Sequence, residues 1–249
     1  MSYYHYNDRH RHRHTEQLPR GGGGKKIPDR WLKYDAIGDN VTGTRFLPFK
    51  TPLHSHICKN SNLREKSFDI EILLQHARES GKSIGLVIDL TNTDKYYNSS
   101  DWSRNGIDYI KIRCPGHEVH EREDVVQHFN RIVDDYVRSH NDDSLIGVHC
   151  THGLNRTGYL ICRYLVEREK WSAQQAIDAF EYARGYPIER GQYKTKLAAV
   201  ENRLAQTAAR TEVMESDSVH VGATLQEKTL TEKTSQSKVK NQKDEDKTV

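Results

Sequence analysis

The stretch from Leu145 to Arg168 limits most strongly what this chain can fold into. Leu145–His149 is a short apolar run, and an apolar helical pattern extends from Gly158 to about Arg168. Gly153 lies in the loop between them and permits a tight backbone path. A strand followed directly by a helix is typical of α/β domains, where ligands bind at the carboxyl ends of the strands. The sequence therefore predicts an α/β domain with a ligand site in this loop.

Further strand and helix patterns alternate along the chain. Ile84–Leu90 is a continuous apolar run, as expected of a strand that helices cover on both faces. Tyr109–Cys114 alternates more, which indicates a less buried strand, and Pro115-Gly116 ends it. Helical patterns span residues 67–79, 122–139, 172–183 and 193–204, and Ser172 with Gln175 forms a capping box. This alternation predicts a central, mainly parallel sheet flanked by helices.

The two ends of the chain differ in composition from the part between them. Residues 1–26 hold alternating Arg and His and then four glycines, while residues 206–249 are rich in Thr, Ser, Lys and Glu. We expect a disordered basic arm (1–26), a folded domain (27–205) and a disordered polar tail (206–249), because such ends cannot bury a core. The mean hydropathy of −0.88 agrees with this division. The arm is either a weak binder of phosphate backbones or a solvated tail.

The cysteines and the apolar runs indicate where the chain resides. No run of about eighteen apolar residues and no apolar signal core is present, so we expect a soluble protein that is not secreted. Cys58, Cys114, Cys150 and Cys162 show neither a Cys-x-x-Cys pair nor zinc-type spacing. This favours free thiols in a reducing compartment. We expect Cys162 to be a core residue, and Cys114 either to pack or to serve as a redox partner.

Cys150 and Arg156 begin and end the loop in the pattern Cys-x5-Arg, with Thr157 following. Loop amides, the helix N-terminus and the guanidinium can lower the pKa of the cysteine thiol and make it a nucleophile. Arg156 can grip two oxygens of a phosphoryl group at once. His149 is expected to fix the loop by hydrogen bonds rather than to transfer protons. The pattern predicts a cysteine phosphatase; the plain alternative is a buried cysteine beside a surface arginine.

The rest of the loop is expected to surround the substrate. The predicted binding residues are Thr151, His152, Gly153, Leu154, Asn155 and Thr157. Successive backbone amides can point at one phosphoryl group, and the hydroxyl of Thr157 lies beside the sulfur. Since amides and Arg156 neutralise the phosphate, we expect no metal ion and no cofactor.

Four segments resemble the RNA 5′-triphosphatase branch of the cysteine phosphatases. They are the loop His-Cys-Thr-His-Gly-Leu-Asn-Arg-Thr-Gly-Tyr at 149–159, Ile27–Lys33, Gly43–Lys50 and Leu86–Thr93. The branch includes the triphosphatase domain of animal mRNA capping enzymes, a baculovirus phosphatase and the RNA/RNP-complex-interacting phosphatases. This chain is more similar to the last group, because it lacks the Lys-x-Asp-Gly motif of guanylyl transfer. The resemblance extends from about residue 27 to 204 and implies a dual-specificity-like phosphatase fold.

The resemblance also implies an activity. Cys150 would attack the terminal phosphoryl group of an RNA 5′ end and form a phosphocysteine that water hydrolyses. Stand-alone members remove the γ and then the β phosphate to give a 5′-monophosphate, whereas capping-type domains stop at the diphosphate. Arg190 matches a basic phosphate contact of these enzymes, although a surface charge is the plain reading. The implied partners are RNA with a 5′-triphosphate or diphosphate end and ribonucleoprotein or RNA-processing proteins. We expect a monomer in the nucleus, and also in the cytoplasm, that does not bind membranes.

The region before the loop lacks the aspartate that protein phosphatases use as a general acid. Residues 114–120 read Cys-Pro-Gly-His-Glu-Val-His, and the next aspartate, Asp124, falls in a predicted helix. A Ser or Tyr leaving group needs a proton in the transition state, whereas a nucleoside phosphate with a last pKa of about 6 to 7 departs without one. Either His117 or Glu118 is a partial acid, or both are plain turn residues; for His117, a contact with the phosphates is a further alternative.

The loop and the region before it favour one of four possible functions. The missing aspartate favours an RNA 5′-polyphosphatase over a dual-specificity protein phosphatase that acts on phosphotyrosine or phosphothreonine. An RNA-binding adaptor with a vestigial site conflicts with the intact Cys150 and Arg156. A lipid phosphatase fits less well, because the loop offers only His152 where such enzymes add lysines.

Overall fold

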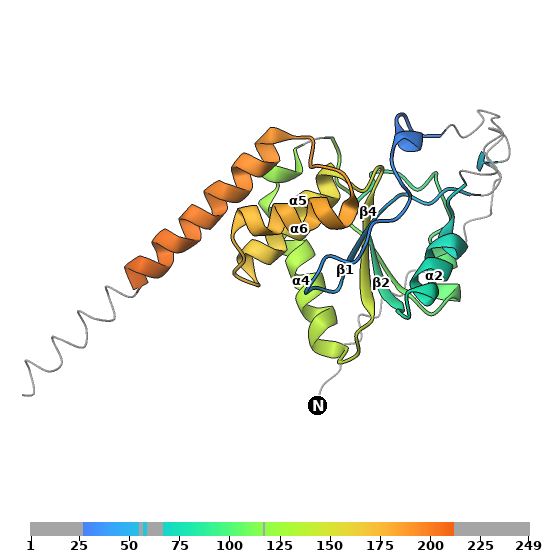
Figure 1. Ribbon diagram of the computed structural model, residues 1–249, viewed down its shortest axis with the longest axis horizontal. Helices are drawn as coiled ribbons and strands as arrows, with labels where there is room; N and C mark the ends of the chain where they lie inside the picture. The colour runs from blue at the N-terminus through green and yellow to red at the C-terminus, as the bar shows by residue number, and fades with distance from the viewer. Residues whose placement is uncertain (1–26, 55–56, 59–66, 117, 212–249) are drawn as a thin grey trace, which may run out of the picture.

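Four parallel strands form the centre of the molecule. In the computed structural model, which describes residues 27–54, 57–58, 67–116 and 118–211 (Figure 1), they are β1 (Phe46–Lys50), β2 (Ile84–Asp89), β3 (Asp108–Lys111) and β4 (Leu145–Cys150). The strand order is β1-β4-β2-β3, so β4 pairs with β1 on one side and with β2 on the other. The predicted α/β class with a mainly parallel sheet is confirmed.

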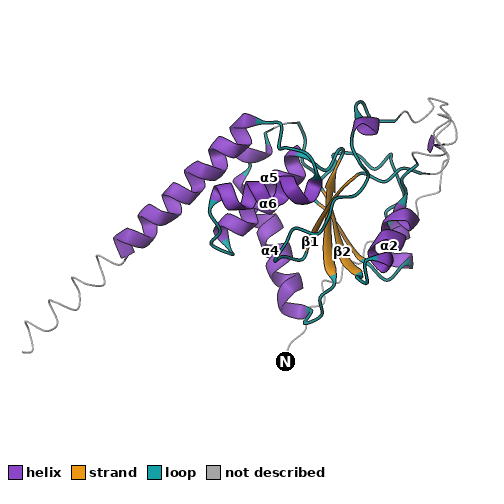
Figure 2. Ribbon diagram, viewed as in Figure 1, coloured by secondary structure: helices purple, strands orange, loops and turns teal. Residues whose placement is uncertain are grey.

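Helices cover both faces of this sheet (Figure 2). One face carries α4 (Glu123–Ser139), α5 (Asn155–Glu167) and α6 (Ala173–Arg184), and the other carries α2 (Ile70–Glu79) and α3 (Ser100–Arg104). Leu86 and Ile88 pack in the first core, whereas Val87 packs in the second. Neighbouring residues of a strand point to opposite faces, so the continuous apolar run of β2 fills both cores.

Several boundaries differ from those that the sequence predicts. Strand β1 escapes the pattern because Pro48 interrupts it; the proline is tolerated since β1 is the edge strand of the four-stranded sheet. The strand predicted to reach Cys114 ends at Lys111, and α5 begins at Asn155, three residues before Gly158. The predicted capping box at the start of α6 is present, with both of its hydrogen bonds.

The last described element is a helix over residues 191–211 that points away from the sheet (Figure 1). The predicted domain boundary after residue 205 therefore falls inside this helix. Residues 205–211 of this helix are all exposed. The apolar pattern therefore stops at Leu204, although the helix continues. The predicted arm (1–26) and the tail beyond 211 lie outside the described residues. No described helix is long and apolar enough to cross a membrane.

Candidate active site

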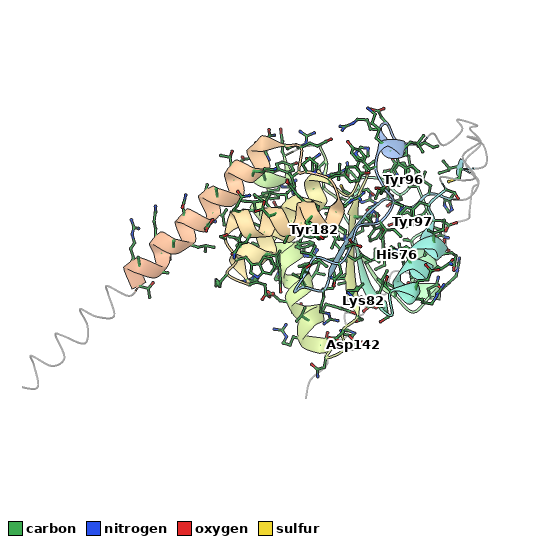
Figure 3. All side chains as sticks on the ribbon, in the orientation of Figure 1. His76, Lys82, Tyr96, Tyr97, Asp142 and Tyr182 are labelled. Atoms are coloured by element: carbon green, nitrogen blue, oxygen red, sulfur yellow. The ribbon has the colours of Figure 1, made fainter. Side chains whose placement is uncertain are left out.

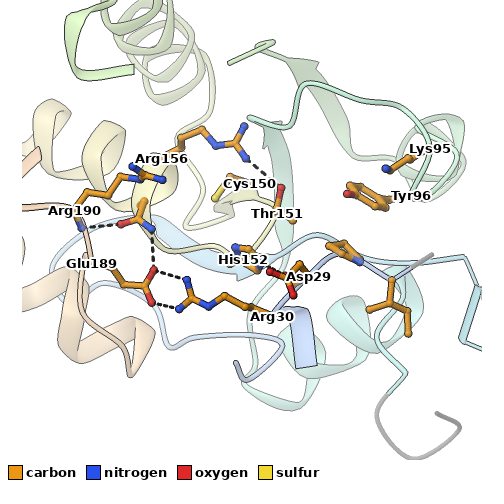
Figure 4. Close-up of a pocket in the computed structure, with 13 residues that line it drawn as sticks. Asp29, Arg30, Lys95, Tyr96, Cys150, Thr151, His152, Arg156, Glu189 and Arg190 are labelled. Carbon is orange, nitrogen blue, oxygen red and sulfur yellow. Dashed lines mark hydrogen bonds and ion pairs between the residues drawn. The ribbon is translucent and has the colours of Figure 1, made fainter. Parts of the chain in front are cut away.

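The loop after β4 opens into a cavity of about 570 Å³ at the carboxyl end of the sheet (Figure 4). Six of the predicted site residues line it, namely Cys150, Thr151, His152, Asn155, Arg156 and Arg190. The remaining walls come from residues 27–30, from Lys95 and Tyr96, and from Glu189. Three segments that are far apart in the sequence therefore enclose the predicted nucleophile.

Cys150 lies at the bottom of this cavity and is nearly fully buried. Burial raises the pKa of its thiol, but the positive charge of Arg156 lowers it, as do hydrogen bonds from the Thr157 hydroxyl and from the amides of Thr157 and His152. The stabilising contacts prevail, and the pKa of Cys150 is below its ordinary value. The site therefore favours a thiolate, which is the nucleophilic form.

The guanidinium of Arg156 is held by the ends of the neighbouring strands. Its Nη1 donates to the carbonyl of Leu90, which follows β2, at 3.0 Å, and to the carbonyl of Cys114 at 2.8 Å. Its Nη2 donates to the hydroxyl of Thr151 at 3.1 Å (Figure 4). These contacts fix the plane of the guanidinium beside the sulfur, which is the orientation required for a bidentate grip on a phosphoryl group.

Gly153 makes the sharp turn of the loop and passes very close to β1. Its φ is +68°, and a Cβ atom there would lie 2.2 Å from the carbonyl oxygen of Phe49. The following residue, Leu154, has its side chain buried outside the cavity, so only its backbone remains for a substrate. The turn therefore requires glycine, both for its left-handed backbone and for the close approach.

Behind the loop, the buried Arg184 donates hydrogen bonds to two carbonyl groups of the loop. Its Nε donates to the carbonyl of Gly153 at 3.2 Å, and its Nη2 donates to those of His152 at 3.1 Å and Asp35 at 2.7 Å. Carbonyl groups held from behind leave the loop free to direct amides at the sulfur. Sequence reasoning missed Arg184, because an arginine in the last turn of a helix is indistinguishable from a surface charge.

His149 lies between Cys150 and a buried polar cluster. Its Nδ1 lies 3.3 Å from the carbonyl of Cys150, and its Nε2 lies 2.8 Å from the hydroxyl of Tyr97, which Figure 3 labels. The same hydroxyl donates to Asp89 at 2.8 Å, and Lys111 pairs with that carboxylate at 2.8 Å. Burial lowers the pKa of His149. A neutral imidazole with both nitrogens engaged holds the loop in place, as the sequence suggested, and is poorly placed to exchange protons.

Two predicted binding residues use their side chains to attach other segments to the loop. The Nε2 of His152 donates to the carbonyl of Asp29 at 2.6 Å. The amide nitrogen of the Asn155 side chain donates to Glu189 at 3.3 Å, and its oxygen accepts from the backbone of Arg190 at 3.1 Å. Their side chains therefore position the walls of the cavity. The predicted contact His117 lies outside the described residues, and Glu118 is exposed and does not line the cavity.

The other two cysteines near the site are buried in the core. Cys162 packs inside α5, and burial raises the pKa of its thiol. Burial also raises the pKa of Cys114 to about 12. Both thiols therefore remain protonated at neutral pH, which favours the packing role that the sequence suggested for each. Within the described chain, no three His, Cys, Asp or Glu side chains gather where they could hold a metal ion.

The Thr157 hydroxyl is fully buried, and its interaction with the sulfur lowers the pKa of Cys150. Replacing Thr157 by valine removes one contact that lowers the pKa of Cys150, so this pKa rises. We expect the acid limb of the kcat/KM profile to move to higher pH, since more alkaline solution is then needed to form the thiolate. Thr195→Val, at an exposed position of the last helix, is the matched control. Coincident profiles for wild type and Thr157→Val would contradict this role.

Comparison with known proteins agrees with this site. The model of the dual specificity phosphatase catalytic domain matches residues 71–203. The RNA/RNP complex-1-interacting phosphatase homolog of Caenorhabditis elegans is 51% identical over 82% of this chain and 87% of that protein. The human RNA/RNP complex-1-interacting phosphatase is 42% identical over 69% of this chain and 51% of its own length. The mouse mRNA-capping enzyme is 38% identical over 69% of this chain and 28% of its own length.

Among solved structures, PTPMT1 in complex with PI(5)P matches with a TM-score of 0.49 and 15% identity, over 70% of this chain and 99% of that one.

The parallel sheet and the loop after β4 define a cysteine phosphatase, which is a hydrolase. The chain belongs to the RNA/RNP complex-1-interacting phosphatase family, a branch of the dual specificity phosphatases that is related to the mRNA-capping enzymes. The predicted resemblance is thereby confirmed. The chain spans about half the length of the human relative.

Proposed function

We propose that this chain removes the γ and then the β phosphate from RNA with a 5′-triphosphate end and leaves a 5′-monophosphate. Two observations support the proposal. The curated relatives at 42% and 51% identity are named for an RNA/RNP complex. The second observation carries the argument: the cavity combines a thiolate-favouring cysteine with several cations, and the described residues provide no well-placed general acid.

The carboxyl groups of Asp124 and Glu189 are unsuited to donate a proton to a leaving group. Asp124 lies in α4 outside the cavity, and its pair with Arg122, with distances of 2.6 and 2.8 Å, lowers its pKa to about 2. Glu189 does line the cavity, but hydrogen bonding from Arg30 lowers its pKa to about 2. Asp29 also lines the cavity, at an exposed position of its wall. Neither Asp124 nor Glu189 is therefore suited to act as the general acid for a leaving group that must be protonated.

A polyphosphate substrate avoids this difficulty. The thiolate of Cys150 attacks the terminal phosphorus, a P–S bond forms, and the bond to the bridging oxygen breaks while Arg156 and the loop amides stabilise the equatorial oxygens. The released diphosphate or monophosphate end carries the electron pair as a stable anion and needs no proton. Water then cleaves the P–S bond and releases phosphate. Removal of the last phosphate would expel a ribose alkoxide, so the reaction should stop at the 5′-monophosphate.

Asparagine variants of Asp29 and Asp124 test the absence of a carboxylic acid from this step. We expect each to retain kcat on 5′-triphosphate RNA within about threefold of wild type, because an essential general acid contributes roughly 100-fold or more. Initial rates across pH provide the measurement. A 100-fold loss together with a lost alkaline limb in either variant would identify an acid and would favour a protein phosphatase instead.

The order of phosphate release tests the proposed function directly. RNA labelled separately at the γ or the β phosphate is incubated with wild-type protein and with Cys150→Ser, in EDTA. We expect γ label to appear first, β label second, and neither with the variant, with full activity in the chelator because amides and Arg156 replace a metal. Faster turnover of phosphotyrosine or phosphothreonine peptides than of this RNA would instead establish the dual-specificity alternative.

A further inference from the structure

We propose that Arg30 binds the phosphate next to the one under attack, so that the segment before β1 selects polyphosphate ends. This inference rests on the proposed function and names a substrate contact within the same site. Residues 27–30 line the cavity that holds Cys150, yet they lie outside residues 71–203, which the phosphatase domain model matches. Arg30 is the cationic residue that this segment adds to the cavity.

Arg30 is oriented by Glu189, which also lines the cavity, and by the nearby Tyr34. Its guanidinium pairs with Glu189 through both Nη atoms (Figure 4). It also contacts the hydroxyl of Tyr34. That hydroxyl donates to Glu189 at 2.7 Å. The Nε–H of Arg30 has no partner among the described residues, and Nη1, which donates once to Glu189, has a second hydrogen to donate. A guanidinium fixed along one edge by a carboxylate keeps its other donors directed and available for phosphate oxygens.

The ion pair is not needed to attach this segment to the domain. Trp31 is buried and donates its indole N–H to the carbonyl of Thr51 at 2.9 Å. The buried Lys50 donates to the carbonyls of Trp31 and Tyr34 at 3.2 and 2.8 Å. The Arg30–Glu189 pair, by contrast, is solvent-exposed, with 41% and 32% of the side chains accessible. Exposed ion pairs add little to stability, so a structural reason for this arginine is weak.

The backbone at Arg30 also departs from the ordinary. Its φ is 57°, a left-handed conformation that is costly for residues with a Cβ atom. Such conformations persist where the surrounding structure holds them, and they often occur at functional sites. Here the conformation places an arginine on the wall of a cavity whose floor is Cys150. The location, the orientation and the strained backbone together favour a ligand contact.

The charges on the cavity wall fit a polyphosphate chain. Arg156 is positioned for the phosphoryl group under attack. The side chain of Asn155 bonds both to Glu189, the partner of Arg30, and to the backbone of Arg190. Arg30 and Arg190 therefore lie on one hydrogen-bonded rim of the cavity. A triphosphate or a diphosphate end has a further phosphate for this rim, whereas a monophosphate end has none. Contacts to the second phosphate would therefore favour the two successive cleavages and disfavour a third.

The test compares Arg30→Gln with Arg138→Gln, an exposed arginine in α4 that pairs with Asp135 and lies outside the cavity. For each protein, kcat/KM is measured on 5′-triphosphate RNA and on p-nitrophenyl phosphate, which has one phosphate and a good leaving group. We expect Arg30→Gln to lower the ratio of the first value to the second by about 10- to 100-fold. The salt dependence of KM for the RNA should weaken by about 0.7 in logarithmic slope. Arg30→Lys should restore the slope but only part of the ratio.

The outcomes separate this inference from the proposed function. If wild-type protein hydrolyses the aryl phosphate but releases nothing from the RNA, the proposed function fails and the inference fails with it. If wild-type protein acts on the RNA and Arg30→Gln shows the same ratio as Arg138→Gln, the inference alone is overturned. Misfolding lowers both activities together, so it leaves the ratio unchanged and cannot imitate the expected result.

Discussion

Cys150→Ser is expected to lower kcat on 5′-triphosphate RNA by about four orders of magnitude or more, with KM changed only a few-fold. A serine hydroxyl is not ionised near neutral pH, and the contacts that stabilise a thiolate cannot deprotonate it. His149 cannot substitute as a base, because Tyr97 and the carbonyl of Cys150 occupy both of its nitrogens. Arg156 still binds the phosphate, so substrate affinity remains.

Single-turnover kinetics with acid quenching provide the measurement for this variant. Wild-type protein should show labelled phosphate bound covalently through sulfur, and Cys150→Ser should show none. Cys162→Ser is the matched control, since Cys162 lies in the core with its sulfur 3.3 Å from the carbonyl of Ala176, a partner that a hydroxyl can also use. It should retain the labelled intermediate. A Cys150→Ser protein with more than about 1% of wild-type kcat would contradict the assignment of the nucleophile.

Gly153→Ala is expected to have the second largest effect, on stability and on activity alike. The added Cβ would lie 2.2 Å from the oxygen and 2.5 Å from the carbon of the Phe49 carbonyl, both in β1. Backbone atoms cannot rotate aside, so the loop must move. We expect a loss of about 2 kcal/mol or more in the free energy of unfolding. Displaced loop amides should also lower kcat/KM at least about 100-fold, as when a transition-state donor is removed.

Urea denaturation and steady-state kinetics measure the two effects, and Gly106→Ala is the control. Gly106 has a similar φ of +72°, but a Cβ there meets nothing within 4 Å. Gly106→Ala therefore measures only the cost of a left-handed backbone, which we expect to be about 1 kcal/mol in the free energy of unfolding. Equal losses for the two variants, with kcat/KM preserved in Gly153→Ala, would show that the close approach to β1 does not shape the loop.

The sequence predicted the sheet and the loop well because both depend on local patterns. Apolar runs identify β2 and β4, and the loop follows β4 directly, so its position at the carboxyl end of the sheet needs no long-range information. Strand β1 was missed, because Phe46–Lys50 contains Pro48 and a lysine that looks exposed. Lys50 is in fact buried, since carbonyl groups of the preceding segment receive its charge. Only the folded chain supplies those partners.

In the candidate site, too, local sequence predicts some residues and only the tertiary structure reveals the others. The sequence by itself predicted the residues proposed to react with the phosphoryl group, because the Cys150-to-Arg156 spacing and Gly153 belong to one strand, loop and helix. The tertiary structure decided what surrounds them. Arg184 is a buried support for the loop, and Arg30 faces Glu189 across 159 positions of sequence. No periodic pattern relates residues that distant, so their roles emerge only when packing brings the segments to one cavity.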